Sequence, residues 1–202
     1  MVASNAALNI DAACQVAHGI STHTVHNEYD YFTAVDDCAP EDNAGAAHLD
    51  TVEYNSSTLY RYATINVPEL FGSMGEQTAP SVRKFAEAFV RSMPTGKQNT
   101  FANGTQPAFV YVAVRKDQPI NFAGAFEQPV AKGAEGGYLK PSIDALVRYS
   151  EKMYENFADA PEAAFVVSMV DLPDDFAQRM RSTAMYDALE ECVRQKTAGE
   201  VM

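Results

Sequence analysis

The stretch FVYVAVR, residues 109–115, decides the fold class, because six of its seven residues are apolar or aromatic. A run of this kind without polar alternation is typical of a strand that is buried on both faces. Working outward from it, we predict three further strands, two long helices and two short closing helices. The predicted strands lie at 16–26, 58–67 and 164–170, and the predicted helices at 80–92, 141–157, 173–180 and 183–196.

The order of these elements predicts an α/β (α+β) fold, because helices separate successive strands. We expect a ferredoxin-like or RNA-recognition-motif palm, with four strands in one antiparallel-rich sheet and helices on one of its faces. About four strands make a partial palm, so we expect an N-terminal portion to be missing and a sheet edge or face to be left exposed. The residues predicted for the core are Ile20, Tyr60, Ile65, Phe85, Phe89, Val110, Val112, Val114, Leu146 and Val166.

Charge is unevenly distributed along the 202 residues, although the net charge is −12. Residues 1–60 contain nine carboxylates and no Lys or Arg, whereas residues 61–150 contain ten basic and seven acidic side chains. A surface that binds phosphates would therefore have to come mainly from the middle segment. The three cysteines are far apart, and no apolar run reaches the roughly eighteen residues of a membrane span. We expect a cytoplasmic protein with reduced thiols and no membrane contact.

Catalytic and metal-binding motifs are absent from the sequence. It contains no GxSxG, no phosphate-binding P-loop and no GxGxxG after a strand. On a strand, His18 and His23 point to opposite faces, so with His26 they are expected to be solvated or core-edge residues and not metal ligands. The acidic group Asp36, Asp37, Glu41 and Asp42 lacks the spacing of a calcium loop and is expected to be solvated. We predict no cofactor and no metal.

Two features point toward nucleic acid without deciding the matter. Tyr31 and Phe32 are adjacent at the entrance to a polar excursion over 36–57, where they either anchor a hairpin on the domain or stack on bases. Lys97, Gln98 and Asn99 lie in a turn-rich loop, where Lys97 is a candidate phosphate contact and the two amides are candidates for sugars or phosphates. A simple solvated loop also fits these residues.

Seven strings of sequence occur in a recognisable order. They are VAHGISTH at 16–23, DYFTAVDD at 30–37, AHL at 47–49, LYRYATIN at 59–66, PTGKQNTFA at 94–102, NFAGAFEQPV at 121–130 and YLKPS at 138–142. Together they resemble the CasC family, the backbone subunits of type I-E CRISPR Cascade complexes. The resemblance extends over nearly the whole chain but includes only about the C-terminal half of the family.

This resemblance implies a structural, guide-RNA-binding subunit and no enzyme. Residues 1–202 would be the C-terminal part of such a subunit, with a thumb hairpin at about 28–54. Tyr31, Phe32 and Thr33 would contact bases, Met1 would pack beside a displaced base, and Lys97 and Gln98 would lie near the RNA backbone. The implied partners are the guide RNA, the target DNA strand, further copies of the chain and the other Cascade subunits.

Two alternatives stay open at the level of the sequence. One is a metal-dependent ribonuclease that uses Asp36 and Asp37, because related backbone subunits of other CRISPR types cut RNA from an acidic loop. The other is a truncated, inactive remnant that folds without assembling. Magnesium-dependent cleavage that is lost in Asp36→Ala would favour the first, and failure to purify with RNA would favour the second.

Overall fold

A three-stranded sheet forms the centre of the computed structural model, which describes residues 12–34 and 48–199. Strands β7 (Phe109–Val114) and β8 (Ala163–Ser168) pair antiparallel along their full lengths, from Phe109 opposite Ser168 to Val114 opposite Ala163. The short β9 (Gln178–Arg179) adds to β8 in parallel, which gives the order β7-β8-β9. The predicted α/β class and the placement of 109–115 and 164–170 in one sheet are confirmed.

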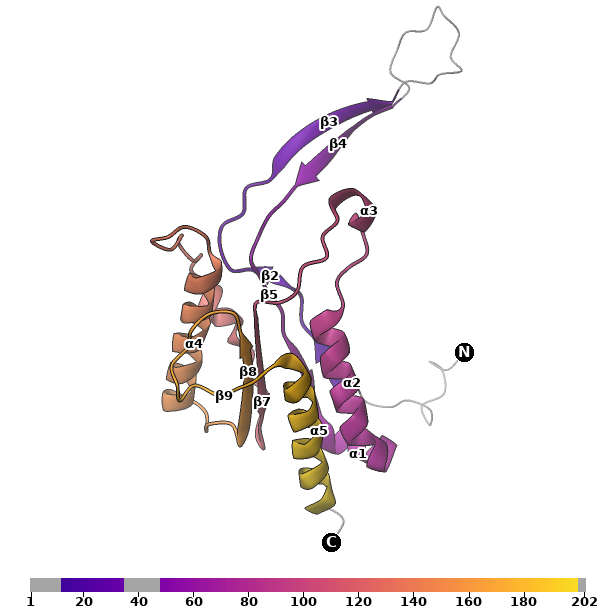
Figure 1. Ribbon diagram of the computed structural model, residues 1–202, viewed down its shortest axis with the longest axis vertical. Coiled ribbons are helices and arrows are strands. Elements are labelled where there is room, and N and C mark those ends of the chain that lie inside the picture. The colour runs from indigo at the N-terminus through magenta and orange to yellow at the C-terminus, as the bar shows by residue number, and fades with distance from the viewer. Residues whose placement is uncertain (1–11, 35–47, 200–202) are drawn as a thin grey trace, which may run out of the picture.

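Helices cover both faces of this sheet, whereas we expected them on one face (Figure 1). On one face, α2 (Thr78–Arg91) and α5 (Ser182–Ala198) pack against Val110, Val112 and Phe165. On the other face, α4 (Leu139–Asn156) and the 3-10 helix η4 (Phe122–Phe126) pack against Phe109, Tyr111 and Val166. The physical reason is visible in β7 itself, since a strand that is apolar at every position needs cover on both sides.

The N-terminal strands form a separate ladder, so the expected single sheet is wrong. Strand β1 (Cys14–Val16) pairs with β6 (Ala63–Ile65), and β2 (Ile20–Ser21) pairs with β5 (Leu59–Tyr60), both antiparallel. Within the described ranges, no backbone hydrogen bond joins this ladder to β7. The ladder nevertheless shares the core, because Ile65 packs into the cluster of α2 and α5 and Tyr60 into the cluster of η4. The apolar pattern of a strand predicts which of its faces is buried, but it does not predict which strand pairs with it.

The sequence analysis missed a helix that begins at Val67. Helix α1 (Val67–Met74) has Pro68 in its first turn, and the Asn66 side chain accepts a hydrogen bond from the Glu69 N–H at 3.2 Å. Proline in the first helical turn behind an Asn cap is a start signal for a helix. The 3-10 turn η3 (Gly75–Gln77) then connects α1 to α2.

The helix predicted at 173–180 is also wrong. The chain turns at Pro173, whose carbonyl accepts from the Phe176 N–H, and then runs beside β8 as β9. A helix of two turns is marginal on its own, and here the open edge of β8 offers the backbone better partners. The predicted helices at 80–92, 141–157 and 183–196 are confirmed within a few residues.

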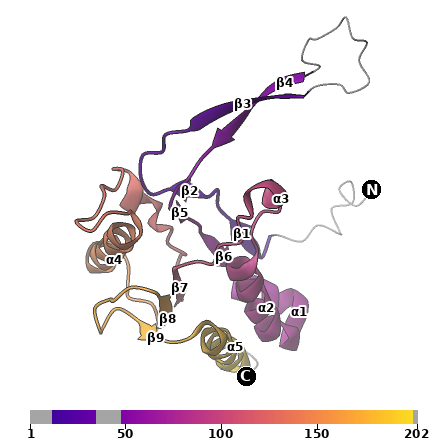
Figure 2. The ribbon, with the colours of Figure 1, turned by 45° about the horizontal axis from the view of Figure 1, so that its top comes forward.

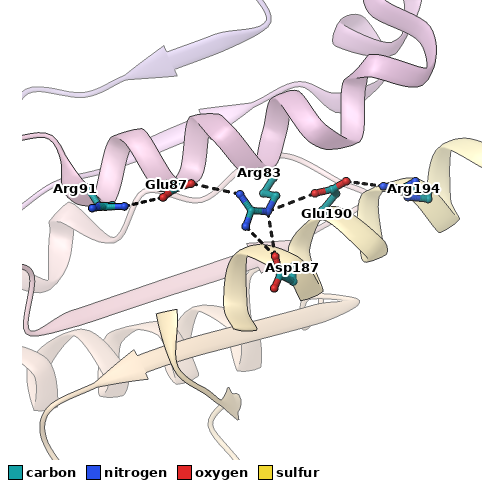
Figure 3. Close-up of polar contacts among 6 residues, drawn as sticks. All are labelled: Arg83, Glu87, Arg91, Asp187, Glu190 and Arg194. Atoms are coloured by element: carbon teal, nitrogen blue, oxygen red, sulfur yellow. Dashed lines mark hydrogen bonds and ion pairs between the residues drawn. The ribbon is translucent and has the colours of Figure 1, made fainter. Parts of the chain in front are cut away.

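An ion-pair network joins α2 to α5 on the surface (Figure 3). The Arg83 guanidinium bonds Asp187 at 2.9 Å and lies 3.3 Å from Glu87 and 3.4 Å from Glu190. Beneath it, Met185, Leu189 and Val193 of α5 are buried against Val82 of α2. Because the charges are partly exposed, each pair adds little, and the apolar contact beneath them holds the helices together. No helix among residues 12–34 and 48–199 is long and apolar enough to cross a membrane.

Candidate nucleic-acid interface

A two-stranded hairpin projects from the rest of the protein (Figures 1 and 2). It consists of β3 (Glu28–Ala34) and β4 (His48–Tyr54), paired antiparallel from Glu28 opposite Tyr54 to Ala34 opposite His48. The described part of the hairpin carries four carboxylates and no Lys or Arg. Phosphates are therefore unsuitable partners for the hairpin itself, and its exposed rings are its usable contact groups.

The register divides the hairpin into two faces, because successive strand residues point to opposite sides. One face, here called the ring face, carries Tyr29, Tyr31, Thr33, Leu49, Thr51 and Glu53. The other, here called the acidic face, carries Glu28, Asp30, Phe32, Asp50, Val52 and Tyr54. Tyr31 and Phe32 are thus on opposite faces, so one base cannot contact both rings.

The exposure of these two rings argues against the interpretation that they anchor the hairpin on the domain. Tyr31 is 73% exposed and Phe32 is 44% exposed, and neither belongs to an apolar cluster of the described chain. They are not core anchors of the hairpin. The large apolar side chains Tyr29 and Leu49 beside them are 65% and 67% exposed, which makes the ring face an apolar surface open to a partner.

The root of the hairpin is fixed by His23 and by Tyr60. The His23 Nε2 accepts from the Thr58 N–H at 3.1 Å, its Nδ1 lies 2.8 Å from the Thr24 carbonyl, and its ring stacks on Tyr138 at 3.6 Å. Burial raises the pKa of Tyr60 to about 12, and its hydroxyl donates to Asn121 and accepts from the Phe122 N–H. Both strands of the hairpin therefore leave from a rigid base.

The loop at 92–108, which carries Lys97 and Gln98, reaches this root. Its one-turn helix α3 (Gln98–Phe101) places the Phe101 ring 5.4 Å from the ring of Tyr54, on the acidic face. Lys97 and Ala102 flank α3 in the left-handed region, with φ of 60° and 50°, which costs a non-glycine residue about 1–3 kcal/mol. Through Phe101, the loop of Lys97 and Gln98 meets the acidic face at Tyr54, at the root of the hairpin, whereas Tyr31 and Thr33 lie on the ring face.

Three cations lie over aromatic rings without a carboxylate partner in the described parts of the chain. The Arg61 guanidinium is 4.4 Å from the centre of the Phe89 ring and also donates to the Ser92 carbonyl. The Nζ of Lys97 lies 5.7 Å from the Phe101 ring, and that of Lys132 lies 5.9 Å from the Tyr138 ring. An exposed cation that is not neutralised by a carboxylate stays available for a phosphate.

Sequence reasoning missed Arg61 and Lys132 although it quoted Arg61. Residues 88–116 contain four cations and no carboxylate, which was the available signal for a basic surface. Of these four, Arg91, Arg115 and Lys116 are paired with Glu87, Asp117 and Glu162, which leaves Lys97. No local pattern distinguishes Arg61 and Lys132, because the folded chain determines which carboxylates they meet.

Other predicted positions lie outside the described residues. These are Met1 and the acidic group Asp36, Asp37, Glu41 and Asp42. Within residues 12–34 and 48–199, no group of three His, Cys, Asp or Glu side chains is placed to hold a metal ion.

Comparison with known proteins gives consistent results. The sequence profile of the CT1975-like protein family matches residues 1–195. One similar solved chain, from a structure titled "CRISPR RNA-guided surveillance complex, pre-nicking", is 32% identical over 96% of this chain, with a TM-score of 0.82. A second, from a "CRISPR RNA-guided surveillance complex", is 33% identical over 95% of this chain, with a TM-score of 0.81. No curated protein matches.

The chain spans 53% of the first of these chains and 75% of the second. A profile match over residues 1–195 and an identity above 30% over nearly the whole chain both exceed what shared fold alone produces. Both solved chains come from CRISPR RNA-guided surveillance complexes, which is consistent with the CasC family that the seven strings resemble. This chain belongs to the CT1975-like family.

Proposed function

We propose that this chain binds guide RNA as a repeating structural subunit of a CRISPR surveillance complex of the Cascade type. In that role it lies beside further copies of itself and the other subunits, and it presents the guide for pairing with a target DNA strand. The observation that carries the proposal is the projecting hairpin with its exposed ring face, set beside a loop of carboxylate-free positive charge.

The division of charge supports RNA as the ligand. Aromatic rings contact bases through their π-faces and need no positive charge, so Tyr29 and Tyr31 suit bases despite the acidity of the hairpin. Arg61, Lys97 and Lys132 are the phosphate contacts in this proposal, since their charges are not neutralised by carboxylates in the described residues. In this proposal, the bases contact the hairpin, and the phosphates contact the body of the protein.

Tyr31 and Phe32 take different roles in this proposal, because they lie on opposite faces. Tyr31 and Thr33 contact a base from the ring face. Phe32 lies on the face shared with Tyr54, where the loop of Lys97 and Gln98 approaches, so it acts as a wedge beside the RNA backbone. Met1 stays part of the proposed site on the strength of the resemblance alone.

The proposal includes a purely structural role with no active site. Target cleavage would then belong to another protein, and no cofactor is required. A cytoplasmic location is part of the same proposal and suits the free thiols of Cys14 and Cys192.

The test is co-purification with guide RNA. The tagged chain is expressed with the other subunits of a surveillance complex, once with and once without a CRISPR array. We expect RNA of guide length, protected from nuclease, only in the first preparation. Assembly of the complex without RNA in both preparations would contradict the proposal, as would purification of the chain free of all other subunits. Loss of intact RNA on adding Mg²⁺, absent in Asp36→Ala, would favour the ribonuclease alternative.

A further inference from the structure

The backbone of the loop at 94–107 bonds only to itself. In the described part of the chain, every backbone hydrogen bond of these residues has both partners inside the range, as when the Phe101 N–H donates to the Lys97 carbonyl at 2.8 Å. Backbone bonds to other elements occur just outside it, where the Ala108 carbonyl accepts from the Met169 N–H. The position of the loop therefore depends on its two ends and on its side-chain contacts.

The conformation of this loop is strained on both sides of α3. Lys97 and Ala102 are the two non-glycine residues with positive φ among those that the structure describes. Such conformations persist only where the surroundings hold them, and they are concentrated at functional sites. Here the turn that they enclose directs the Phe101 ring toward the hairpin, where it stacks on Tyr54 with an angle of 27° between the ring planes.

The stack of Phe101 on Tyr54 joins the loop to the root of the hairpin. Tyr54 is the last residue of β4, at the end of the arrow that enters the body of the protein (Figure 1). Although both rings belong to projecting segments, Phe101 is only 37% exposed and Tyr54 only 45%. The Nζ of Lys97 lies 5.7 Å from the same Phe101 ring. One ring is therefore close both to the hairpin and to a candidate phosphate contact.

The root determines where the rest of the hairpin lies. Residues 22–27 and 55–58 are outside both the ladder of β2 with β5 and the ladder of β3 with β4, so the chain can bend there. The described hairpin is about 20 Å long, and a rotation of about 10° at its root displaces the far end by about 3.5 Å. A binding site needs its groups held to within about 0.5 Å. A contact at Tyr54 is placed to prevent this rotation.

We propose that Phe101 is a positioning residue for RNA, because its ring braces the root of the hairpin against the loop of Lys97. The brace fixes the distance between the base that Tyr31 contacts on the ring face and the phosphate that Lys97 contacts. Both contacts then form on one RNA strand without a further entropic cost for ordering the hairpin. This role rests on the proposed function, and it requires no contact between Phe101 and RNA.

The orientation of the hairpin is measured first, in the full chain without RNA. The three native cysteines are replaced by Ala, and spin labels are attached at Thr51→Cys on the hairpin and Thr183→Cys on α5. Pulsed electron paramagnetic resonance then gives the distribution of distances between the labels. We expect a narrow distribution when Phe101 is present. In Phe101→Ala we expect a distribution wider by about 3 Å, as a rotation of about 10° at the root produces.

Three further variants make this measurement specific. Phe101→Tyr keeps the ring and is expected to keep the narrow distribution. Phe157→Ala removes a ring that is 84% exposed and follows α4, and it should also leave the distribution narrow. Tyr54→Ala removes the other ring of the stack and should widen the distribution as Phe101→Ala does. It takes the place of Phe101→Ala if that variant does not fold.

RNA binding by the assembled complex is measured next. We expect Phe101→Ala to weaken it by about 3- to 10-fold, the usual size of one contact between two rings, and Phe101→Tyr to restore it. In a Tyr54→Ala background, Phe101→Ala should have no further effect, because either substitution removes the same stack. A ring that itself stacked on a base would lower the affinity in that background as well.

Four results would overturn the proposal. They are an unchanged distance distribution in Phe101→Ala, a wider distribution with unchanged RNA affinity, losses that multiply for Phe101 and Tyr54, and a lower denaturation midpoint in Phe101→Ala. The last would make the ring a part of the stable fold. A complex that holds no RNA would contradict the proposed function, whereas the distance measurement would still decide whether Phe101 braces the hairpin.

Discussion

The hairpin β3–β4 and the pair β7–β8 are both antiparallel ladders, yet their side chains have opposite surroundings. Helices cover β7–β8 on both faces, and Phe165 and Val166 are buried. The hairpin is longer in register, but Tyr29, Tyr31 and Leu49 are mostly exposed. Aromatic and β-branched residues therefore predict strands in both regions, but they do not predict whether the side chains are buried. In the sheet they stabilise the fold, and in the hairpin they are available to a partner.

Substitutions in the core between α5 and the sheet should lower stability strongly, and substitutions at exposed positions should lower it little. We expect Met185→Ala to lower the free energy of unfolding by about 2–5 kcal/mol, because Met185 is fully buried between α5 and the sheet. Chemical denaturation gives the value. Met169→Ala is the matched control, since Met169 is 79% exposed and should change stability by less than about 0.5 kcal/mol. Equal effects of the two substitutions would contradict the assignment of the core.

Guide binding should respond to the hairpin instead. We expect Tyr31→Ala to weaken RNA binding by the assembled complex by about 1–3 kcal/mol, the usual value of one base–ring stack. Titration with labelled guide RNA measures this change. Phe32→Ala should act independently, because its ring is on the other face. The double variant should unfold at the same denaturant concentration as the wild type.

An exposed ring elsewhere provides the control for this prediction. Phe157 follows α4 and is 84% exposed, so Phe157→Ala removes a comparable ring far from the hairpin. It should leave RNA binding unchanged. A loss of binding equal to that of Tyr31→Ala would show that general hydrophobicity, and not the ring face, contributes the affinity.

The salt dependence of RNA binding should identify the cations of the hairpin root. Each of Arg61→Ala, Lys97→Ala and Lys132→Ala should lower the slope of log Kobs against log salt by about one unit, whatever the guide sequence. Lys116→Ala is the control, because Lys116 is also exposed but is paired with Glu162 at 2.5 Å. An unchanged slope in all three variants would remove these residues from the phosphate surface.

The smallest expected effect concerns the other end of the sheet. Lys116 and Lys196 hold the pKa of Glu162 below its ordinary value. A carboxyl with a lowered pKa in the folded state contributes stability above its ordinary pKa, about 4.3, and this contribution is lost as the pH falls below it. Glu162→Gln should therefore make stability fall less steeply over that acid range. Denaturation curves at several pH values test this, and parallel curves for both proteins would contradict it.

The sequence predicted those elements whose apolar residues form a clear pattern, either along one buried face or along the whole element. The periodic apolar residues of α4, such as Ile143 and Leu146, and the unbroken run of β7 predicted these elements correctly. Phe85 and Phe89 were expected in the core, but they are half-buried and stack on each other, with Arg61 over Phe89. Their spacing is that of a buried helix face, but the surrounding chain covers these two rings only in part.

The candidate site was predictable only in part. The aromatic pair and the polar excursion indicated the hairpin, and alternation along β3 already separates Tyr31 from Phe32 once its strand conformation is known. Which cations remain without carboxylates was not predictable, because Glu162 meets Lys116 and Lys196 from distant parts of the chain. The strand partners were not predictable either, because the apolar pattern of a strand does not determine which other strand pairs with it.

The contact between α2 and α5 has a consequence for the order of folding. Arg83 and Asp187 are 104 residues apart in sequence, whereas Ala34 and His48 close a loop of only about fourteen residues. Closing the longer loop costs about 2 kcal/mol more chain entropy, so we expect α5 to dock late. Until it docks, Ala79, Val82 and Phe165 face water, and the newly made chain is at its most prone to aggregation.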